Sequence, residues 1–217
     1  MVRFEGVEVR YGGKAILQNV SFDIGEGEKV VFYGKSGSGK TTILTTILGA
    51  HIPSRGRLYF DGRVVNAKNI IDVRRAVSYI GQEPVLGAER IIDAILLPYS
   101  FKVHRATVPS EETITGLLEL LHLSRDILNK DAAVVSGGEK QRVAIVRELL
   151  QNKELFLVDE LTSALDRESK GAVLDLFRNS GYTLISVSHD PDWYKICTRF
   201  MKVEGGRIVL SSDHPEL

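Results

Sequence analysis

The stretch Gly34–Thr41 combines glycines, a lysine and a hydroxyl side chain at fixed spacing. It reads GKSGSGKT and fills every position of the pattern G-x-x-x-x-G-K-[ST], which binds the phosphates of nucleotides. Glycines let successive backbone N–H groups point inward around a polyphosphate. We expect Lys40 to reach the β- and γ-phosphates and Thr41 to coordinate Mg²⁺. The candidate nucleotide-binding residues here are Gly34, Lys35, Ser36, Gly37, Ser38, Gly39, Lys40, Thr41 and Thr42.

The segments on both sides of the loop supply the context that the motif needs. Lys29–Tyr33 is a short apolar run typical of a buried strand, and Thr42–Leu48 predicts a helix that Gly49 ends. A surface turn that matched the pattern by chance would have no reason for these neighbours. The N-terminus of the helix would add positive potential at the anion.

Two acids follow a second apolar run. Leu155–Val158 is typical of a parallel strand buried on both faces, and Asp159 and Glu160 come directly after it. Downstream of a phosphate loop, this pair predicts that Asp159 holds Mg²⁺ and that Glu160 polarises a water that attacks the γ-phosphate. The alternative is a solvated pair of acids at the end of a strand.

His189 lies just beyond another apolar run, Thr183–Val187. Parallel strands bring their carboxyl ends to one edge of the sheet, so His189 is expected beside the same site. A single histidine is more often structural. Its position favours contact with the γ-phosphate rather than a role as the base.

The remaining pattern predicts one α/β domain over 1–217 that a helical segment interrupts. Residues 2–10 and 15–24 read as the first strands, and the spacing of Ser136 and Glu139 predicts a capped helix that runs to about residue 152. The expected organisation is a catalytic core with a β subdomain in 1–82 and 136–217, and an all-helical insertion in 83–135.

Composition excludes several classes of function. The chain has 28 Lys and Arg against 28 Asp and Glu, so no overall basic field attracts nucleic acid, and no nucleic-acid partner is expected. Cys197 is the only cysteine, which excludes a disulfide framework. No apolar run has the length of a membrane span, so we expect a soluble, cytoplasmic protein that can attach to a membrane partner.

Taken together, the motifs resemble the ATP-binding subunits of ABC transporters over essentially the whole chain. Tyr11 matches the aromatic residue that stacks on adenine, and Gln82 matches the glutamine that reaches the metal and the attacking water. Residues 136–142 resemble the LSGGQ signature, and residues 163–166 resemble the D-loop. The resemblance implies a P-loop NTPase of ABC ATPase type, with a RecA-like core, an N-terminal antiparallel β subdomain and an inserted α-helical subdomain.

The resemblance also implies roles for individual residues, with ATP and Mg²⁺ as cofactors. The implied catalytic residues are Glu160, His189 and Gln82. The implied metal ligands are Thr41, Gln82 and Asp159. Outside the phosphate loop, the implied nucleotide-binding residues are Tyr11, Ser136, Gly137, Gly138 and Glu139.

The chain departs from the family pattern at Val135, Glu139 and Leu161. Glu139 stands where the signature has glutamine. An acid in the first turn of a helix is favourable, but a carboxylate beside a triphosphate is repelled by it. We expect Glu139 to cap its own helix and to face away from the nucleotide, with activity kept.

The family also implies partners. Two chains in a head-to-tail homodimer would enclose ATP between the phosphate loop of one and the signature of the other. Solute transport would run through a separate membrane permease at the cytoplasmic face of the membrane. The expected docking surface is apolar, although its members could instead pack internally: Pro84, Val85, Leu86, Leu97, Pro98, Tyr99 and Phe101.

A narrower resemblance, to the Fet-type (YbbL-like) iron exporter, implies export of metal ions. It rests on residues 82–87, 97–99, 136–142 and 159–166. One alternative is an ABC ATPase that drives envelope or cell-division coupling instead of transport. Another is a phosphate-loop kinase of small molecules, which would have no reason for the sequence of residues 136–142.

Overall fold

The structure is a computed structural model that describes residues 1–101 and 107–215. In chain order its strands and α-helices are β1 (Val2–Tyr11), β2 (Lys14–Ile24), β3 (Lys29–Tyr33), α1 (Lys40–Ile47), β4 (Arg55–Phe60), β5 (Arg63–Val64), α2 (Ile70–Ala76), β6 (Val77–Ile80), α3 (Ile91–Leu96), α4 (Glu111–Leu120), α5 (Gly137–Leu149), β7 (Leu155–Asp159), α6 (Arg167–Asn179), β8 (Thr183–Val187), α7 (Pro191–Tyr194), β9 (Arg199–Glu204) and β10 (Arg207–Ser212). The 3₁₀ helices Leu97–Ser100 and Arg125–Asn129 lie between α3 and α5.

Contacts within the chain separate it into two compact units. The first unit holds residues 1–79, 154–160 and 181–217, and the second holds residues 80–153 and 161–180. The second unit is larger than the insertion expected at 83–135, since it also takes in α5 and α6. Residues 102–106 of that insertion lie outside the described residues, and the expected domain boundaries stay a prediction.

A six-stranded sheet in the order β10-β9-β3-β8-β7-β6 carries the apolar runs of the sequence. Strand β3 pairs in parallel with both β8 and β9, and β8 pairs in parallel with β7. Every residue of β7 and β8 is buried, as expected for strands covered on both faces. The carboxyl ends of β3, β7 and β8 therefore share one edge of the sheet. The predicted α/β fold is confirmed.

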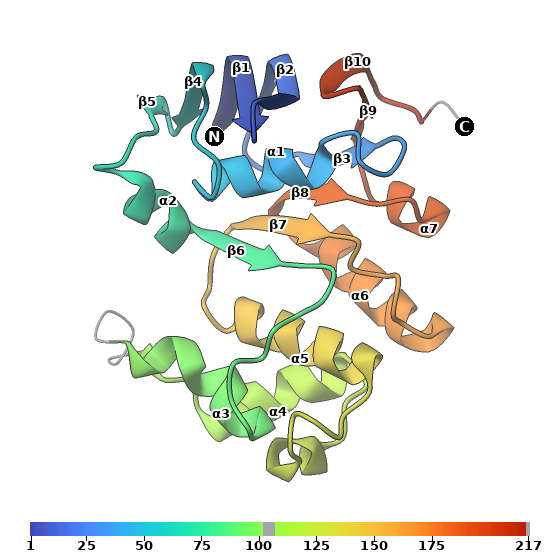
Figure 1. The fold of residues 1–217 in the computed structure, drawn as a ribbon. Helices are drawn as coiled ribbons and strands as arrows, with labels where there is room; N and C mark the ends of the chain where they lie inside the picture. The colour runs from blue at the N-terminus through green and yellow to red at the C-terminus, as the bar shows by residue number, and fades with distance from the viewer. Residues whose placement is uncertain (102–106, 216–217) are drawn as a thin grey trace. The chain divides into compact units, whose positions relative to one another are not determined.

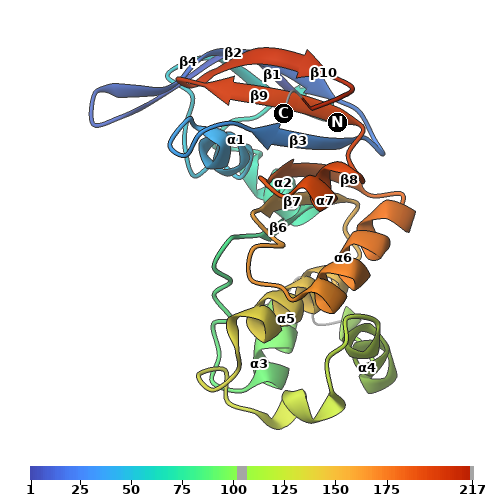
Figure 2. The ribbon, with the colours of Figure 1, turned by 90° about the vertical axis from the view of Figure 1, so that its right-hand side faces the viewer.

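The second sheet of the first unit is antiparallel and comes from the alternating residues near the start of the chain. Its order is β2-β1-β4-β5. Helix α1 contacts β2 of this sheet and β7 and β8 of the parallel sheet, and Figures 1 and 2 show α1 beside β3. A buried apolar cluster joins both sheets to α1 and includes Phe4, Phe32 and Ile43. This core holds the loop between β3 and α1 in place.

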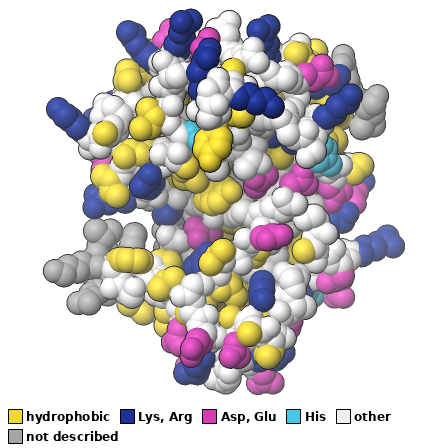
Figure 3. Space-filling model, viewed as in Figure 1, with side chains coloured by type: hydrophobic (Ala, Val, Ile, Leu, Met, Phe, Trp, Pro, Cys, Tyr) yellow, Lys and Arg dark blue, Asp and Glu magenta, His cyan; other side chains and the backbone are white. Residues whose placement is uncertain are grey.

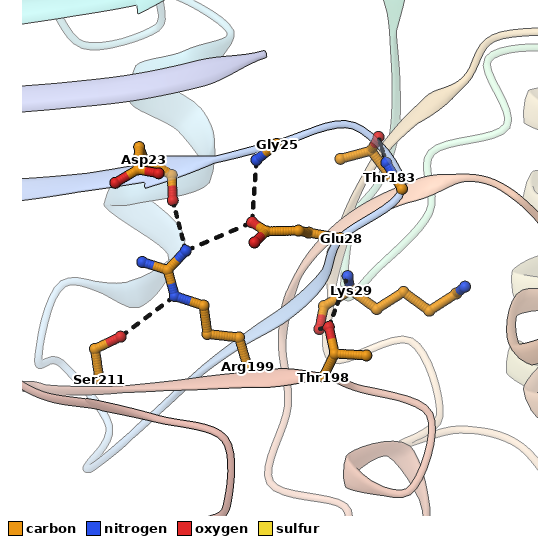
Figure 4. Close-up of polar contacts among 9 residues, drawn as sticks. Asp23, Gly25, Glu28, Lys29, Thr183, Thr198, Arg199 and Ser211 are labelled. Carbon is orange, nitrogen blue, oxygen red and sulfur yellow. Dashed lines mark hydrogen bonds and ion pairs between the residues drawn. The ribbon is translucent and has the colours of Figure 1, made fainter.

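Polar contacts fix the amino end of β3, opposite the phosphate loop. Arg199 donates to the carbonyl of Asp23 at 2.8 Å and lies 3.5 Å from the carboxylate of Glu28. That carboxylate also accepts from the N–H of Gly25 at 3.0 Å. Figure 4 shows these groups meeting at the turn before β3. They set where β3 begins, and so where the loop at its other end emerges.

Helix α5 contacts both α3 and α4 in the second unit. Residues 89–101 are helical in pattern and belong to the insertion expected to be all-helical, and the structure divides this stretch into α3 and a 3₁₀ helix from Leu97. Pro98 explains this division, because proline lacks the N–H that an α-helix needs in its interior.

Within residues 1–101 and 107–215, every helix is too short or too polar to cross a membrane. Side chains of both charge signs lie on the face drawn in Figure 3, in keeping with the balanced composition. The thiol of Cys197 donates to the carbonyl of Trp193 at 3.4 Å, and burial raises its pKa to about 12.

Candidate nucleotide site

The phosphate loop takes backbone conformations that only glycine adopts easily. Gly34 has φ 131° and Gly39 has φ 107°, both in the left-handed half of the map. A Cβ atom on Gly34 would lie 2.3 Å from the carbonyl oxygen of Val203 on β9, and one on Gly39 would lie 2.9 Å from Leu17 on β2. The loop thus needs glycine both for its turn and for its close contact with the strands beside it.

Lys40 begins α1 and folds back onto the loop. Its ammonium donates to the carbonyls of Gly34 at 2.7 Å and Lys35 at 3.0 Å. Burial lowers the pKa of Lys40, while the charges of Glu160 and Asp159 oppose this shift. The lysine is therefore held inside the loop, at the place where the motif puts the phosphates.

Ser38 leaves a buried polar atom without a partner. Its side chain is 7% exposed, and its Oγ has no hydrogen-bond partner among the described residues. An unpaired buried hydroxyl is unfavourable unless a bound group satisfies it. This orphan lies beside the N-terminus of α1, whose first turn holds no acid. The unpaired hydroxyl and the helix N-terminus without an acid both favour binding of an anion by the loop.

Asp159 ends β7 and lies against the start of α1. Asp159 as a whole is 4% exposed, and its carboxylate accepts a hydrogen bond from the hydroxyl of Thr41. Burial raises the pKa of Asp159, and the hydrogen bond from Thr41 and the charge of Lys40 oppose the shift. Two hard oxygen donors, predicted from separate motifs, meet here.

Glu160 and His189 come together at the same edge of the sheet. Nε2 of His189 is 3.5 Å from a carboxylate oxygen of Glu160. Glu160 has φ 51°, an uncommon conformation for a residue with a Cβ, and its N–H donates to the carbonyl of Val187 on β8 at 2.9 Å. Burial raises the pKa of Glu160, which brings it closer to the range useful for a base at neutral pH.

Tyr11 lies at the tip of the β1–β2 hairpin and is 75% exposed. The start of β2 reaches the phosphate loop, since a Cβ on Gly39 would meet Ile16 and Leu17. The aromatic ring is therefore available for stacking in the unit that carries the loop.

The signature residues form the capped start of α5 in the second unit. Ser136 Oγ accepts from the N–H of Glu139 at 3.2 Å, and the Glu139 carboxylate accepts from the N–H of Ser136 at 2.8 Å. The predicted capping box is confirmed. The other oxygen of Glu139 lies 3.6 Å from the ammonium of Lys130.

Gln82 also belongs to the second unit, where two side chains of α5 hold the loop that follows β6. Gln141 donates to the carbonyl of Gly81 at 3.2 Å. Arg147 donates to the carbonyls of Val85 and Leu86 at 3.2 and 3.1 Å. The segment around Gln82 is thus attached at both ends to the helix that begins with the signature.

The apolar surface expected around residues 84–101 is only partly exposed. Val85 is 81% exposed and Phe101 is 62% exposed. Leu86 and Tyr99 are buried instead, and the hydroxyl of Tyr99 donates to the carbonyl of Leu150 at 2.6 Å. For these two residues, the alternative of internal packing is correct.

The sequence motifs did not point to Lys130, Gln141 or Arg147 as supporting residues. Gln141 lies within residues 136–142, and Arg147 lies on the same helix, so the predicted helix is a usable signal for both. Lys130 has no such signal, because it lies outside every motif and meets Glu139 only through the fold.

Comparison with known proteins agrees with this geometry. The model of a family described as ABC transporter matches residues 17–163. The chain is 32% identical over 196 residues to the probable iron export ATP-binding protein FetA of Escherichia coli (strain K12), and the match covers 88% of this chain and 86% of that protein.

A solved structure, the dimeric post-hydrolysis state of the ATP-binding cassette MJ0796 bound to ADP and Pi, is similar with a TM-score of 0.87. It is 26% identical in sequence, and the match covers 100% of both chains.

Other relatives are much longer than this chain. It spans 17% of multidrug resistance protein 1 of Entamoeba histolytica, at 30% identity over 227 residues, with all of this chain covered. It spans 32% of the alpha-hemolysin translocation ATP-binding protein HlyB of Proteus vulgaris, at 32% identity over 225 residues, again with all of this chain covered. Because the family model covers most of the chain and FetA is similar over nearly all of both proteins, the chain belongs to the ABC transporter family and carries the ATPase cassette of that family.

Proposed function

We propose that the chain binds and hydrolyses ATP and that hydrolysis powers transport of a solute across a membrane through a separate permease. The observation that carries the proposal is the meeting of Lys40, Asp159 and Glu160 at one edge of the parallel sheet. Lys40 binds the β- and γ-phosphates, Glu160 accepts a proton from the attacking water, and His189 contacts the γ-phosphate.

Thr41 and Asp159 fit a magnesium site. Mg²⁺ in nucleotide sites is usually held by one or two carboxylates together with phosphate oxygens, and it keeps several waters. The described residues hold no cluster of three or more His, Cys, Asp or Glu, which would suit a different kind of metal site. The buried carboxylate of Asp159 and the hydroxyl of Thr41, which both belong to the first unit, would hold the ion. Bound there, the ion neutralises charge on the phosphates.

A head-to-tail homodimer would complete the site. The phosphate loop and Glu160 lie in one unit of the chain, and Ser136 to Glu139 begin a helix in the other. The N-terminus of that helix suits an anion. In a dimer with two-fold symmetry, the signature of each chain would close on the ATP of its partner. The dimeric structure of MJ0796, a similar cassette, supports dimer formation.

The permease would contact the exposed apolar residues of the segment 84–101. Val85 and Phe101 are accessible, and Arg147 holds the backbone beside Val85. Because α5 carries both the signature and Arg147, closure at one end of the helix can move the docking residues. This arrangement would hold the chain at the cytoplasmic face of the membrane.

Iron is the proposed solute. The support is the similarity to FetA, which, unlike the similarity to HlyB, runs over nearly all of the other protein as well as of this chain. Everted vesicles from the source cells should accumulate ferrous iron when ATP is added. Vesicles in which Glu160→Gln replaces the normal chain should not. Equal accumulation in both would remove iron export from the proposal.

The direct test of the ATPase is Glu160→Gln. We expect the variant to bind ATP while hydrolysis falls about 100-fold or more, because the base is lost. The control is Glu154→Gln, which alters an exposed acid next to the opposite end of β7. Hydrolysis is measured by phosphate release, and turnover of Glu160→Gln close to normal would exclude Glu160 as the base.

A further inference from the structure

The signature of this chain carries a negative charge where the family pattern has a neutral glutamine. Glu139 cannot lose this charge at neutral pH, because the hydrogen bonds from Ser136 lower its pKa, with a smaller contribution from Lys130. A carboxylate close to a triphosphate raises the free energy of the complex. A neighbouring group must therefore compensate for it if ATP is to be enclosed here.

Lys130 is placed to do this. Its ammonium lies 3.6 Å from Glu139 Oε1, while Oε2 accepts from the N–H of Ser136. Its backbone is fixed from both sides, since its N–H donates to Ile127 at 3.0 Å and its carbonyl accepts from Ile91 at 3.1 Å. Arg142, the nearby arginine of α5, donates instead to the carbonyls of Gly138, Leu121 and His122 and to the hydroxyl of Ser169, and none of these is the Glu139 carboxylate. Lys130 is thus the cation directed at the signature carboxylate.

We propose that Lys130 is a positioning residue for ATP-driven dimerisation, which holds Glu139 in its cap and cancels the charge that would repel the partner's triphosphate. The ion pair is expected to add little to the free energy of unfolding, because Lys130 is about half exposed and exposed ion pairs contribute little to folding. This inference rests on the proposed function, because it needs a second chain to bring ATP to the signature.

A double-mutant cycle tests the coupling. Lys130→Met keeps most of the apolar stem and removes the charge, and Glu139→Gln keeps a residue that can complete the capping box. We expect Lys130→Met to raise the ATP concentration for half-maximal hydrolysis about three- to ten-fold at low salt, and less at about 0.5 M salt because of screening. In the Glu139→Gln background the same change should have an effect below about two-fold, within the scatter of additive substitutions.

The control is Arg125→Met, which removes a positive charge from an exposed ion pair with Glu111 in the same unit. It should leave the dependence on ATP unchanged. Thermal unfolding of each variant checks that it is folded. An effect of Lys130→Met that is absent, independent of salt, or equally large in the Glu139→Gln background would overturn the inference.

Dimerisation of Glu160→Gln by ATP is measured separately, by size-exclusion chromatography. If that dimer fails to form, the proposed function is wrong, whereas a dimer without coupling between Lys130 and Glu139 excludes only the role of Lys130.

Discussion

Two adjacent glycines of the signature have very different surroundings within the chain. A Cβ on Gly137 would meet nothing within 4 Å, whereas one on Gly138 would lie 2.9 Å from the carbonyl oxygen of Ala164. Within residues 1–101 and 107–215, no atom therefore requires glycine at position 137. Gly138 is required by the fold itself.

This contrast gives a test of the proposed nucleotide site formed by two chains. Gly137→Ala should keep or slightly raise stability, by up to about 1 kcal/mol, because alanine favours a helix. Its hydrolysis of ATP should nevertheless fall at least about ten-fold, because in the proposed dimer the new methyl group would meet the partner's nucleotide. Gly138→Ala should lower the melting temperature on its own. Normal hydrolysis by Gly137→Ala would speak against a nucleotide that approaches this turn.

Several residues of the candidate site, but not all of its geometry, could be predicted from the sequence. Lys40, Thr41, Asp159, Glu160 and His189 were predicted from three separate motifs, and the structure brings them to one edge of a sheet. This worked because parallel pairing puts strand ends together. The left-handed conformation of Glu160 could not be predicted, because only the packing of β7 against β8 imposes it.

At the scale of elements, helix α6 depends on an acidic cap. Asp166 accepts from the N–H groups of Glu168 and Ser169 at 3.0 Å each and from the hydroxyl of Ser169 at 2.7 Å. These hydrogen bonds, first those of Ser169, lower the pKa of Asp166 from 3.8 to about 2. Folding therefore favours the charged form of this carboxylate.

The cap makes stability depend on pH in a defined window. The folded chain binds this proton more weakly than the unfolded chain does, so the contribution of Asp166 is full above about pH 4 and is lost as the pH falls toward 2. Asp166→Asn keeps a good capping residue and removes the titration. Its urea midpoint should fall less steeply than that of the wild type over this window. Parallel curves would show that Asp166 does not contribute.

The helical segments were predicted less well than the strands. A continuous apolar run identifies a buried strand, but the apolar residues after Gln82 fitted both a docking surface and an internal contact. Tyr99 is buried because its hydroxyl reaches a carbonyl at the end of α5, a partner 51 positions away in the chain. Local patterns carry no information on such a contact.

At the scale of the whole molecule, the rate of ATP hydrolysis per chain should depend on protein concentration. If each ATP needs two chains, the hydrolysis rate per chain will fall almost in proportion to protein concentration once the chains are diluted below their dimerisation constant. Phosphate release measured from micromolar down to nanomolar chain at saturating ATP tests this. A constant rate per chain across the range would assign the whole site to one molecule.

The thiol of Cys197, near the end of α7, is partly buried, and this has a practical consequence. A group with a pKa of about 12 is almost entirely protonated at neutral pH, and only the thiolate reacts with common labelling reagents. Since Cys197 is the sole native cysteine, a second cysteine placed by mutagenesis would take up a fluorophore or spin label nearly alone. Opening and closing of paired chains can then be followed spectroscopically without first removing the natural residue.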